Sequence, residues 1–521
     1  MSHTAKRGGN LRDNIRSWIQ PKAIAMLFLG FSAGLPILLI FSTLSVWLRE
    51  AGVERSAVTF FSWAALGYSF KFLWAPLVDI LPLPFLTRFL GRRRAWMLLA
   101  QCGVIGSIVS MSMVDPAAHI SLTVMAMAAV CLGFSSATQD IVIDAYRIEC
   151  AETNLQALLA AMYISGYRIG MVVAGAGSLF IATYFGTSRE LYSYSAWQST
   201  YLSMSAIMGI GVITTLIIRE PEANLEKVRD SYPAGDYLRI LLMFLVALGC
   251  FVVSFIVSGE KIVAVTAGLG SESFFSGPVG AFIVEIMRFV LSFVVGAAGG
   301  YITVKLGLVN KKMAHMTYVA PAVDFFQRYG GRTAIIFLCL IGCYRFSDIV
   351  LGVVSNVFYV DMGFSKNVIG GITKTFGLGM TLVGGFVGGL LTMRYSVYSI
   401  LFLGGLLAAG TNLLFMLLAK TGADVTLLTV VIGADNLSAG IATTAFIAFL
   451  SSLTNISFTA VQYAVFSSLM TLFPKVLGGY SGTMVSNVGY EKFFLFTALM
   501  GIPALIFIWI VRREIELKTH S

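Results

Sequence analysis

The chain has 521 residues, of which 57% are hydrophobic and 12% are charged, and its mean hydropathy is +0.84. A soluble globular chain carries about 25% charged residues, so too few polar side chains are present here to cover several water-soluble domains. The net charge of +10 fits basic loops that face anionic lipid better than a nucleic-acid surface, because the longest basic run, Arg92–Arg94, is only a short loop. These features predict an all-α polytopic membrane protein.

Apolar stretches of the length that crosses a bilayer, about 20 residues, recur along the chain. The first stretch follows a basic segment and lacks a clear small-residue cleavage site, so we expect a retained signal-anchor. We predict fourteen membrane spans, at 23–48, 57–78, 95–114, 120–145, 156–184, 197–218, 237–257, 278–304, 333–360, 367–392, 396–419, 425–452, 458–478 and 491–511.

The lysines and arginines between these spans are distributed unevenly. If the N-terminus is cytoplasmic, the inside segments carry far more of them than the outside segments, which predicts that both termini are cytoplasmic. The long polar stretches 219–236 and 305–332 bracket two spans, and removing this bracket leaves six spans on each side. We therefore expect the major facilitator fold, with a six-helix bundle at 1–222, a linker with two extra transmembrane helices at 223–314, and a second six-helix bundle at 315–521.

Ionisable residues inside a membrane span are expensive and usually face a water-filled cavity or an opposite charge. In a facilitator fold the first, second, fourth and fifth helices of each half line the cavity, and all central charges of the twelve core spans fall on such helices. They are the cations Lys71, Arg168, Arg345 and Lys374 and the acids Asp140, Asp144, Asp348 and Asp435.

Four cations spread over both halves suit an anionic or zwitterionic solute, and buried acids beside cations can carry protons. We therefore expect the cations to bind substrate and the acids to couple transport to protons. Structural alternatives stay open, because Asp144 with Arg147, and Arg345 with Asp348, are spaced as i,i+3 ion pairs. Further candidates for substrate binding are Tyr68, Tyr167, Gln139 and Gln462, for which helix packing is the competing explanation.

No motif indicates a cofactor, a metal or an enzymatic activity. All cysteines except Cys150 lie in apolar runs, no C-x-x-C pair occurs, and the four histidines lie outside the spans. The glycine-rich loop of ATP motors and the common hydrolase and zinc-protease motifs do not occur in the sequence.

Several runs of sequence resemble the AmpG family of muropeptide permeases, over most of 22–222 and 315–511. Their combination of FKFLW-x-P-L-x-D with TQD-IV-x-DA is fairly specific. The runs are GFSAGLP at 30–36, FKFLWAPLVD at 70–79, GRRRAW at 91–96, SSATQDIVIDAYR at 135–147, SGYRIGM at 165–171, CYRFSDI at 343–349, ITKTFGLG at 372–379, DNLSAGIATTAFIAFL at 435–450 and FTAVQYA at 458–464.

This resemblance implies proton-driven import of GlcNAc-anhydroMurNAc, with or without its peptide, from the periplasm across the bacterial inner membrane during peptidoglycan recycling. Two departures stand out: Asp435 replaces a family glutamate, and the extra helix pair lies between the halves instead of after the second. The implied partners are a sugar-peptide substrate, protons and membrane lipids, without nucleic acid. Two alternatives stay open, a carrier of another anionic solute such as acetyl-CoA, and a membrane enzyme or scramblase that acts on cell-wall precursors.

Overall fold

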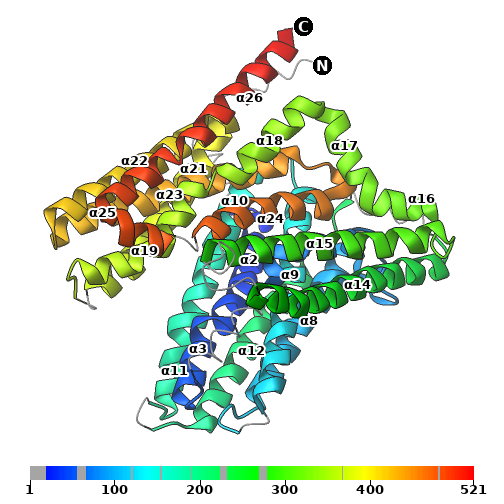
Figure 1. Cartoon of the computed structure of the whole chain (residues 1–521), viewed down its shortest axis with the longest axis horizontal. Coiled ribbons are helices and arrows are strands. Elements are labelled where there is room, and N and C mark those ends of the chain that lie inside the picture. The colour runs from blue at the N-terminus through cyan, green and yellow to red at the C-terminus, as the bar shows by residue number, and fades with distance from the viewer. Residues whose placement is uncertain are drawn as a thin grey trace. The chain divides into compact units, whose positions relative to one another are not determined.

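The computed structural model describes residues 19–54, 61, 66–118, 121–152, 155–188, 191–222, 232–268, 278–365, 368–478 and 481–520 (Figure 1). Within these ranges the chain forms helices joined by short turns, and 12 of the helices are long and apolar enough to cross a membrane. The all-helical, multi-pass prediction is therefore confirmed. Two of the fourteen predicted spans, 57–78 and 458–478, do not reach this threshold in the described residues, so the count of fourteen stays a prediction.

The chain divides into two compact units. The first contains the chain up to Val78, then Pro82–Glu226, and the chain from Phe325 onward; the second contains Asp79–Leu81 and Lys227–Asp324. All twelve predicted core spans thus belong to the first unit, and the predicted extra pair belongs to the second. The domain boundaries at 222 and 314 stay predictions.

The N-terminal half contains the helices that Figure 1 draws from blue to cyan-green. They are α2 (Pro21–Ile40), α3 (Ser42–Glu50), α5 (Leu66–Phe70), the 3₁₀ turn η2 (Lys71–Leu73), α6 (Ala75–Ile80), α7 (Leu86–Leu90), α8 (Arg92–Ser112), α9 (Ser121–Glu149), α10 (Gln156–Val172), the π-helical η4 (Val173–Gly177), α11 (Ser178–Tyr184) and α12 (Tyr194–Ile217).

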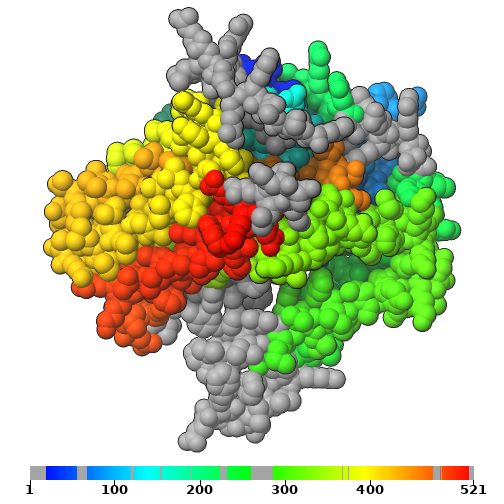
Figure 2. Space-filling view, turned by 90° about the horizontal axis from the view of Figure 1, so that it is seen from above, coloured from blue at the N-terminus to red at the C-terminus, as the bar shows by residue number. Residues whose placement is uncertain are grey.

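The C-terminal half begins with an amphipathic entry helix and continues with the predicted spans. In Figure 2, α22, α25 and α26 form one continuous surface, gold to red, in agreement with their mutual contacts. The elements of this half are α17 (Ala320–Tyr329), α18 (Gly331–Cys343), α19 (Phe346–Asp361), the π-helical η7 (Ile369–Phe376), α21 (Gly377–Arg394), α22 (Val397–Thr421), α23 (Val425–Leu453), η8 (Ile456–Phe458), α24 (Thr459–Gly478), α25 (Ser481–Leu499) and α26 (Ile502–His520).

The chain leaves the N-terminal half after α12, and we call this end of the first unit the linker end. Hydrogen bonds show which other helix ends lie there. The Arg93 guanidinium forms a two-point ion pair with Glu149, with N–O distances of 2.7 and 3.0 Å, at the start of α8 and the end of α9. Glu220, just after α12, accepts the backbone N–H groups of Arg93 and Arg94 at 2.8 and 3.1 Å. Lys22 donates to the carbonyl of Cys150 at 2.5 Å, so the start of α2 lies at the same end. The Glu220 and Lys22 contacts cap helix ends whose backbone groups would otherwise lack partners.

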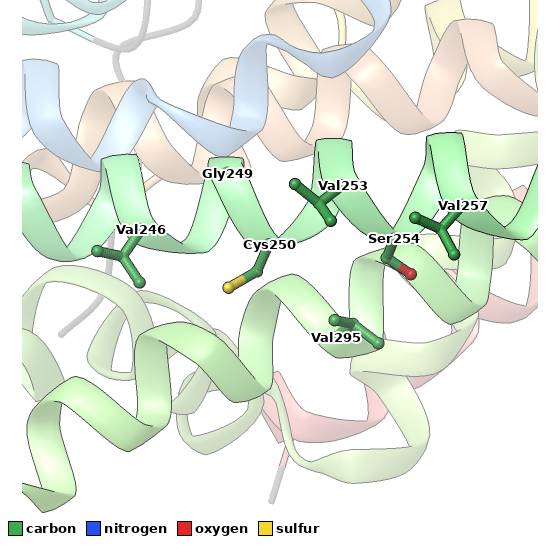
Figure 3. A pocket seen from close by; sticks show the side chains of 7 residues that line it. All are labelled: Val246, Gly249, Cys250, Val253, Ser254, Val257 and Val295. Carbon is green, nitrogen blue, oxygen red and sulfur yellow. The ribbon is translucent and has the colours of Figure 1, made fainter.

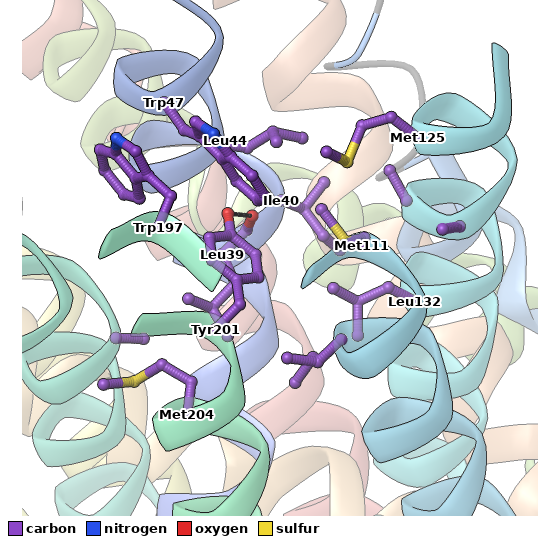
Figure 4. Packing of buried hydrophobic residues seen from close by; sticks show 14 of the residues in the cluster. Leu39, Ile40, Leu44, Trp47, Met111, Met125, Leu132, Trp197, Tyr201 and Met204 are labelled. Carbon is purple, nitrogen blue, oxygen red and sulfur yellow. Dashed lines mark hydrogen bonds between the residues drawn. The ribbon is translucent and has the colours of Figure 1, made fainter. Parts of the chain in front are cut away.

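An apolar cluster in the N-terminal half lies near the opposite end (Figure 4). The indole rings of Trp47 and Trp197 stack with centroids 5.7 Å apart, and the Tyr201 hydroxyl donates to the carbonyl of Leu39 at 3.0 Å. In a lipid solvent, close van der Waals packing and satisfied hydrogen bonds stabilise helix contacts more than apolar burial does. The cluster therefore fixes α2, α3 and α12 as one body.

Glycines allow α2 and α10 to approach to backbone contact. A Cβ atom at Gly166 would lie 1.9 Å from the carbonyl oxygen of Leu27, and one at Gly30 would lie 2.1 Å from that of Tyr163. Small residues at crossing points let membrane helices pack at such short range. The interface between α21 and α23 repeats this design, since a Cβ at Gly384 would lie 2.2 Å from the Leu437 carbonyl oxygen.

We expect Gly166→Ala to lower the thermal unfolding temperature of the detergent-solubilised protein by several degrees, because the added methyl group meets backbone that cannot move aside. Overpacking of this kind costs about 1–3 kcal/mol. Gly106→Ala in α8 is the matched control, since a Cβ there has no other atom within 4 Å and alanine favours the helix. Equal unfolding temperatures for the two variants would contradict the close packing of α2 on α10.

The second unit contains two long apolar helices, α14 (Ala234–Gly268) and α15 (Pro278–Lys305), which pack against each other. The ring of Phe251 meets that of Phe289 edge-on at 5.5 Å. The Arg288 guanidinium donates to the carbonyl of Phe255 at 2.8 Å and lies 4.4 Å from the centre of its ring. The side chain of Glu285, a partner suggested for Arg288 by its i,i+3 spacing, lies outside the described residues.

Figure 3 shows a shallow apolar groove on this pair. It is lined by Val246, Gly249, Cys250, Val253, Ser254, Val257 and Val295. The groove has no charged lining residue, and Ser254 is its one polar side chain. We predict that the pair does not line the transport pathway.

That prediction can be tested by removing residues 231–310 and rejoining the chain with a flexible polar linker. We expect the shortened protein to insert and to transport at a rate within about threefold of the full chain, because the two six-helix halves retain all their own helices. Uptake per inserted molecule would be measured in proteoliposomes. Normal insertion with no uptake would show that the pair takes part in transport.

Candidate functional site

A broken helix places Lys71 inside the N-terminal half. The predicted continuous span 57–78 is instead divided into α5, η2 and α6 over its described part. Pro76 explains the break, because it has no N–H for the carbonyl of Phe72 and its ring clashes there. Trp74 anchors the turn, with its indole N–H donating to Thr138 Oγ1 at 3.0 Å. Lys71 lies at the first position of the 3₁₀ turn and is buried.

Lys71 faces two acids on α9. Its Nζ lies 3.8 Å from Asp144 Oδ2, and Asp140 lies within its electrostatic range. Asp140 and Asp144 are four residues apart, so they share one face of the helix. Both are less than a tenth exposed, and the Tyr163 hydroxyl donates to Asp140 Oδ1 at 3.4 Å. The structure thus brings together three of the predicted residues as one buried charge cluster.

Two tyrosines extend this cluster. The Tyr68 hydroxyl donates to Ser136 Oγ at 2.6 Å, and the ring of Tyr167 lies 6.1 Å from that of Tyr163. Tyr68 also lies within electrostatic range of Tyr167 and Asp140. Both predicted tyrosines therefore lie beside the acids, as a polar aromatic wall on α5 and α10.

A second group of charges comes from both halves. Arg345 occupies the break between α18 and α19, and its Nη2 lies 2.5 Å from Asp348 Oδ2 in the first turn of α19. Arg168 on α10 of the other half is an exposed side chain within electrostatic range of both Arg345 and Asp348. Two cations and one carboxylate leave an excess positive charge, and such an excess can hold an anion.

Asp435 lies near this group of charges but is hydrogen-bonded to another helix. Its Oδ1 accepts a hydrogen bond from Thr411 of α22 at 3.0 Å, and Asp348 is within its electrostatic range. The neighbouring Asn436 instead faces α21, where its Oδ1 accepts from Thr381 at 2.9 Å. In this conformation the acid is held by the outer helix α22, and the amide is on the side predicted to line the cavity.

Two predicted amides lie in packed regions. Gln139 is fully buried and donates to Ser32 Oγ at 2.9 Å. Gln462 is 3% exposed, and its Oε1 accepts from Arg328 at 3.0 Å and from the backbone N–H of Asn455 at 2.8 Å. Both contacts connect separate parts of the fold, and both side chains are buried, although Gln139 Oε1 accepts no hydrogen bond from the described residues. The side chain of Lys374 lies outside the described residues.

Arg147 was expected at most to pair with Asp144 and extend to the surface. Instead it is fully buried, and its Nη1 donates to Ser451 Oγ of the other half at 2.8 Å. The long-range partner could not be read from the sequence, where Ser451 is one of many serines near helix ends. The pairing with Asp144 does occur, at 3.4 Å.

Comparison with known proteins extends this picture. The family model described as "Acetyl-coenzyme A transporter 1" matches residues 23–231. The chain is 28% identical over 491 residues to "Putative transporter AmpG 4" of Rickettsia felis, covering 94% of this chain and 96% of that one. It is also 28% identical over 503 residues to the "Anhydromuropeptide permease" of Escherichia coli K12, covering 96% of this chain and 82% of the relative.

Solved structures give the fold. The proton:xylose symporter XylE, of the major facilitator superfamily, superposes with a TM-score of 0.56 at 12% identity and covers 96% of both chains. FucP in its outward conformation gives 0.54 at 13% identity, covering 95% of this chain and 99% of that one. These relatives are named as permeases and transporters, which agrees with a transport function and not with an enzyme. The chain thus has the major facilitator fold, and it is similar over nearly its full length to proteins named as AmpG transporters and anhydromuropeptide permeases.

Proposed function

We propose that this transporter imports anhydro-muropeptides, GlcNAc-anhydroMurNAc with or without peptide, from the periplasm to the cytosol of a bacterium, driven by protons. It would lie in the inner membrane with fourteen spans and both termini in the cytoplasm. The linker end would then be the cytoplasmic end.

The observation that carries the proposal is the pair of cations Arg168 and Arg345, one from each half, with Asp348 beside them. A carboxylate-bearing solute bound there would contact both halves at once. Such a position suits alternating access, in which the halves rock around a central site. The exposed guanidinium of Arg168 offers a planar fork that matches a carboxylate.

The second element is the buried cluster of Lys71, Asp140 and Asp144. A carboxyl group that is buried beside a cation and a second acid can take up and release a proton as its surroundings change. Asp140 is the foremost candidate carrier, with Asp144, Asp348 and Asp435 as the other acids proposed. The relative named anhydromuropeptide permease supports the choice of substrate.

The direct test is uptake of radiolabelled GlcNAc-anhydroMurNAc into proteoliposomes that contain the purified full chain. Accumulation is expected with an inwardly directed proton gradient and should collapse with a protonophore. A second candidate, acetyl-CoA, is favoured by the family model that matches 23–231, and it is offered as labelled substrate and as competitor in parallel. Uptake of acetyl-CoA without uptake of the muropeptide would replace the first candidate by the second.

A further inference from the structure

We propose that Arg147 is a latch that holds the two halves together at the linker end, and that Asp144 sets the strength of this latch. The inference rests on the proposed function in one respect, since alternating access requires the linker end to open. It adds the residue whose contacts must break for that opening.

The hydrogen bonds of Arg147 connect three helices. Its Nη1 donates to Ser451 Oγ on α23 at 2.8 Å and to Gln156 Oε1 on α10 at 3.3 Å. The Ser451 hydroxyl donates its own proton to the carbonyl of Ile447 at 2.7 Å, so its lone pairs remain to accept from the guanidinium. Gln156 donates in turn to the carbonyl of Ile148 at 3.1 Å and thereby caps the end of α9. The guanidinium is thus held in one orientation, toward the other half.

A cation–π contact and an apolar contact at the same place strengthen the connection between the two halves. The guanidinium of Arg147 lies 5.2 Å from the centre of the Tyr463 ring on α24, within the range of a cation–π contact. The next residue, Ile148, is 6% exposed and belongs to the apolar cluster of the C-terminal half, with Phe446 and Phe449. Residues at the end of α9 therefore insert into the other half, and the linker end is closed here.

The charge balance links this contact to the proposed site. Asp144 lies 3.4 Å from Arg147 and 3.8 Å from Lys71, so one carboxylate serves two buried cations. If its charge is lost, Arg147 becomes a buried cation without a counter-charge, which is strongly unfavourable. Water reaches the guanidinium only when the halves separate, so neutral Asp144 favours an open linker end. Conversely, charged Asp144 stabilises the closed state.

The test measures the distance between the halves without substrate or gradient. Spin labels are placed at Phe89→Cys in α7 and Ser396→Cys before α22, both exposed, in the otherwise cysteine-free full chain in lipid nanodiscs. Pulsed electron–electron double resonance then measures the distances between the two labels, and the distance distribution gives the closed and open populations. Arg147→Gln and Asp144→Asn should each raise the open-to-closed ratio by about tenfold or more, the effect of losing a hydrogen bond to a charged group. Ser451→Ala should raise it by a smaller factor.

Ser452→Ala is the matched control, because its exposed hydroxyl bonds only to the Phe449 carbonyl of its own helix, and it should leave the distances unchanged. Unchanged distances in both Arg147→Gln and Ser451→Ala would overturn the latch. So would an equal shift in Ser451→Ala and Ser452→Ala. Because no solute is used, this result stands even if the muropeptide proves not to be the substrate, and failed uptake in the parent chain leaves it unaffected.

Discussion

Asp140→Asn is expected to reduce gradient-driven accumulation to the level of empty liposomes while preserving the exchange of labelled for unlabelled substrate across the membrane. Asparagine keeps the shape of the side chain and can still accept the hydrogen bond from Tyr163, but it cannot bind and release a proton. Exchange needs only reorientation with substrate bound, whereas accumulation needs the proton. Both would be measured in the same proteoliposomes, with and without an imposed gradient.

Asp424→Asn serves as the control for this substitution. Asp424 is exposed and caps α23 by accepting the backbone N–H of Leu427 at 3.0 Å, and asparagine caps a helix equally well. Full accumulation by Asp140→Asn would show that another acid carries the proton. Asp144, one turn away, would then be the first candidate. Comparison with Asp435→Asn then tests whether the acid held by Thr411 takes part at all.

Arg168→Lys is expected to raise the apparent KM for uptake by about tenfold or more, with normal expression and thermal stability. Lysine keeps the charge but loses the planar fork that forms two parallel hydrogen bonds with a carboxylate. Because Arg168 lies near Arg345, a substrate carboxylate between them would be contacted from both halves. Losing one fork therefore weakens binding without emptying the site of positive charge.

Arg394→Lys, at the end of α21, is the matched control. This arginine is exposed, and its guanidinium lies 5.7 Å from the centre of the Tyr395 ring, outside the proposed site. Initial rates over a range of substrate concentrations separate KM from kcat. A wild-type KM in Arg168→Lys would show that Arg168 makes no two-point contact with the substrate and only balances nearby charge.

The regular features of this fold could be predicted from the sequence, because long apolar stretches have few structural solutions in a membrane. The helical spans follow from that constraint. The break at Lys71 was missed, although Pro76 marked it, because the residues around it are apolar enough to resemble a continuous span. Helix interruptions depend on local backbone chemistry that a hydropathy window averages away.

The charged residues could be found in the sequence, but their directions could not. Asp435 and Asn436 are adjacent, so they point about 100° apart on the helix, and only the contacts with Thr411 and Thr381 show which one faces which neighbour. Gln139 and Gln462 were chosen for their polarity, yet both hydrogen-bond within packed helices. Arg147 shows the converse, since a basic residue at a helix end is ordinarily solvated and its partner lies 304 residues away.

The glycine contact between α2 and α10 has a consequence for biosynthesis. The helix α2 packs on α10, which is made more than 120 residues later, and Gly30 lies against the backbone of Tyr163 where they cross. Until α9 is made, Ser32 of α2 also lacks its later partner Gln139. Its hydroxyl bridges that interval by donating to the carbonyl of Leu29 at 2.8 Å, so the helix carries its polar side chain satisfied from within. The glycine-lined face of α2 is therefore covered only once α10 is inserted, and a chain that ends before α10 would leave that face exposed to lipid.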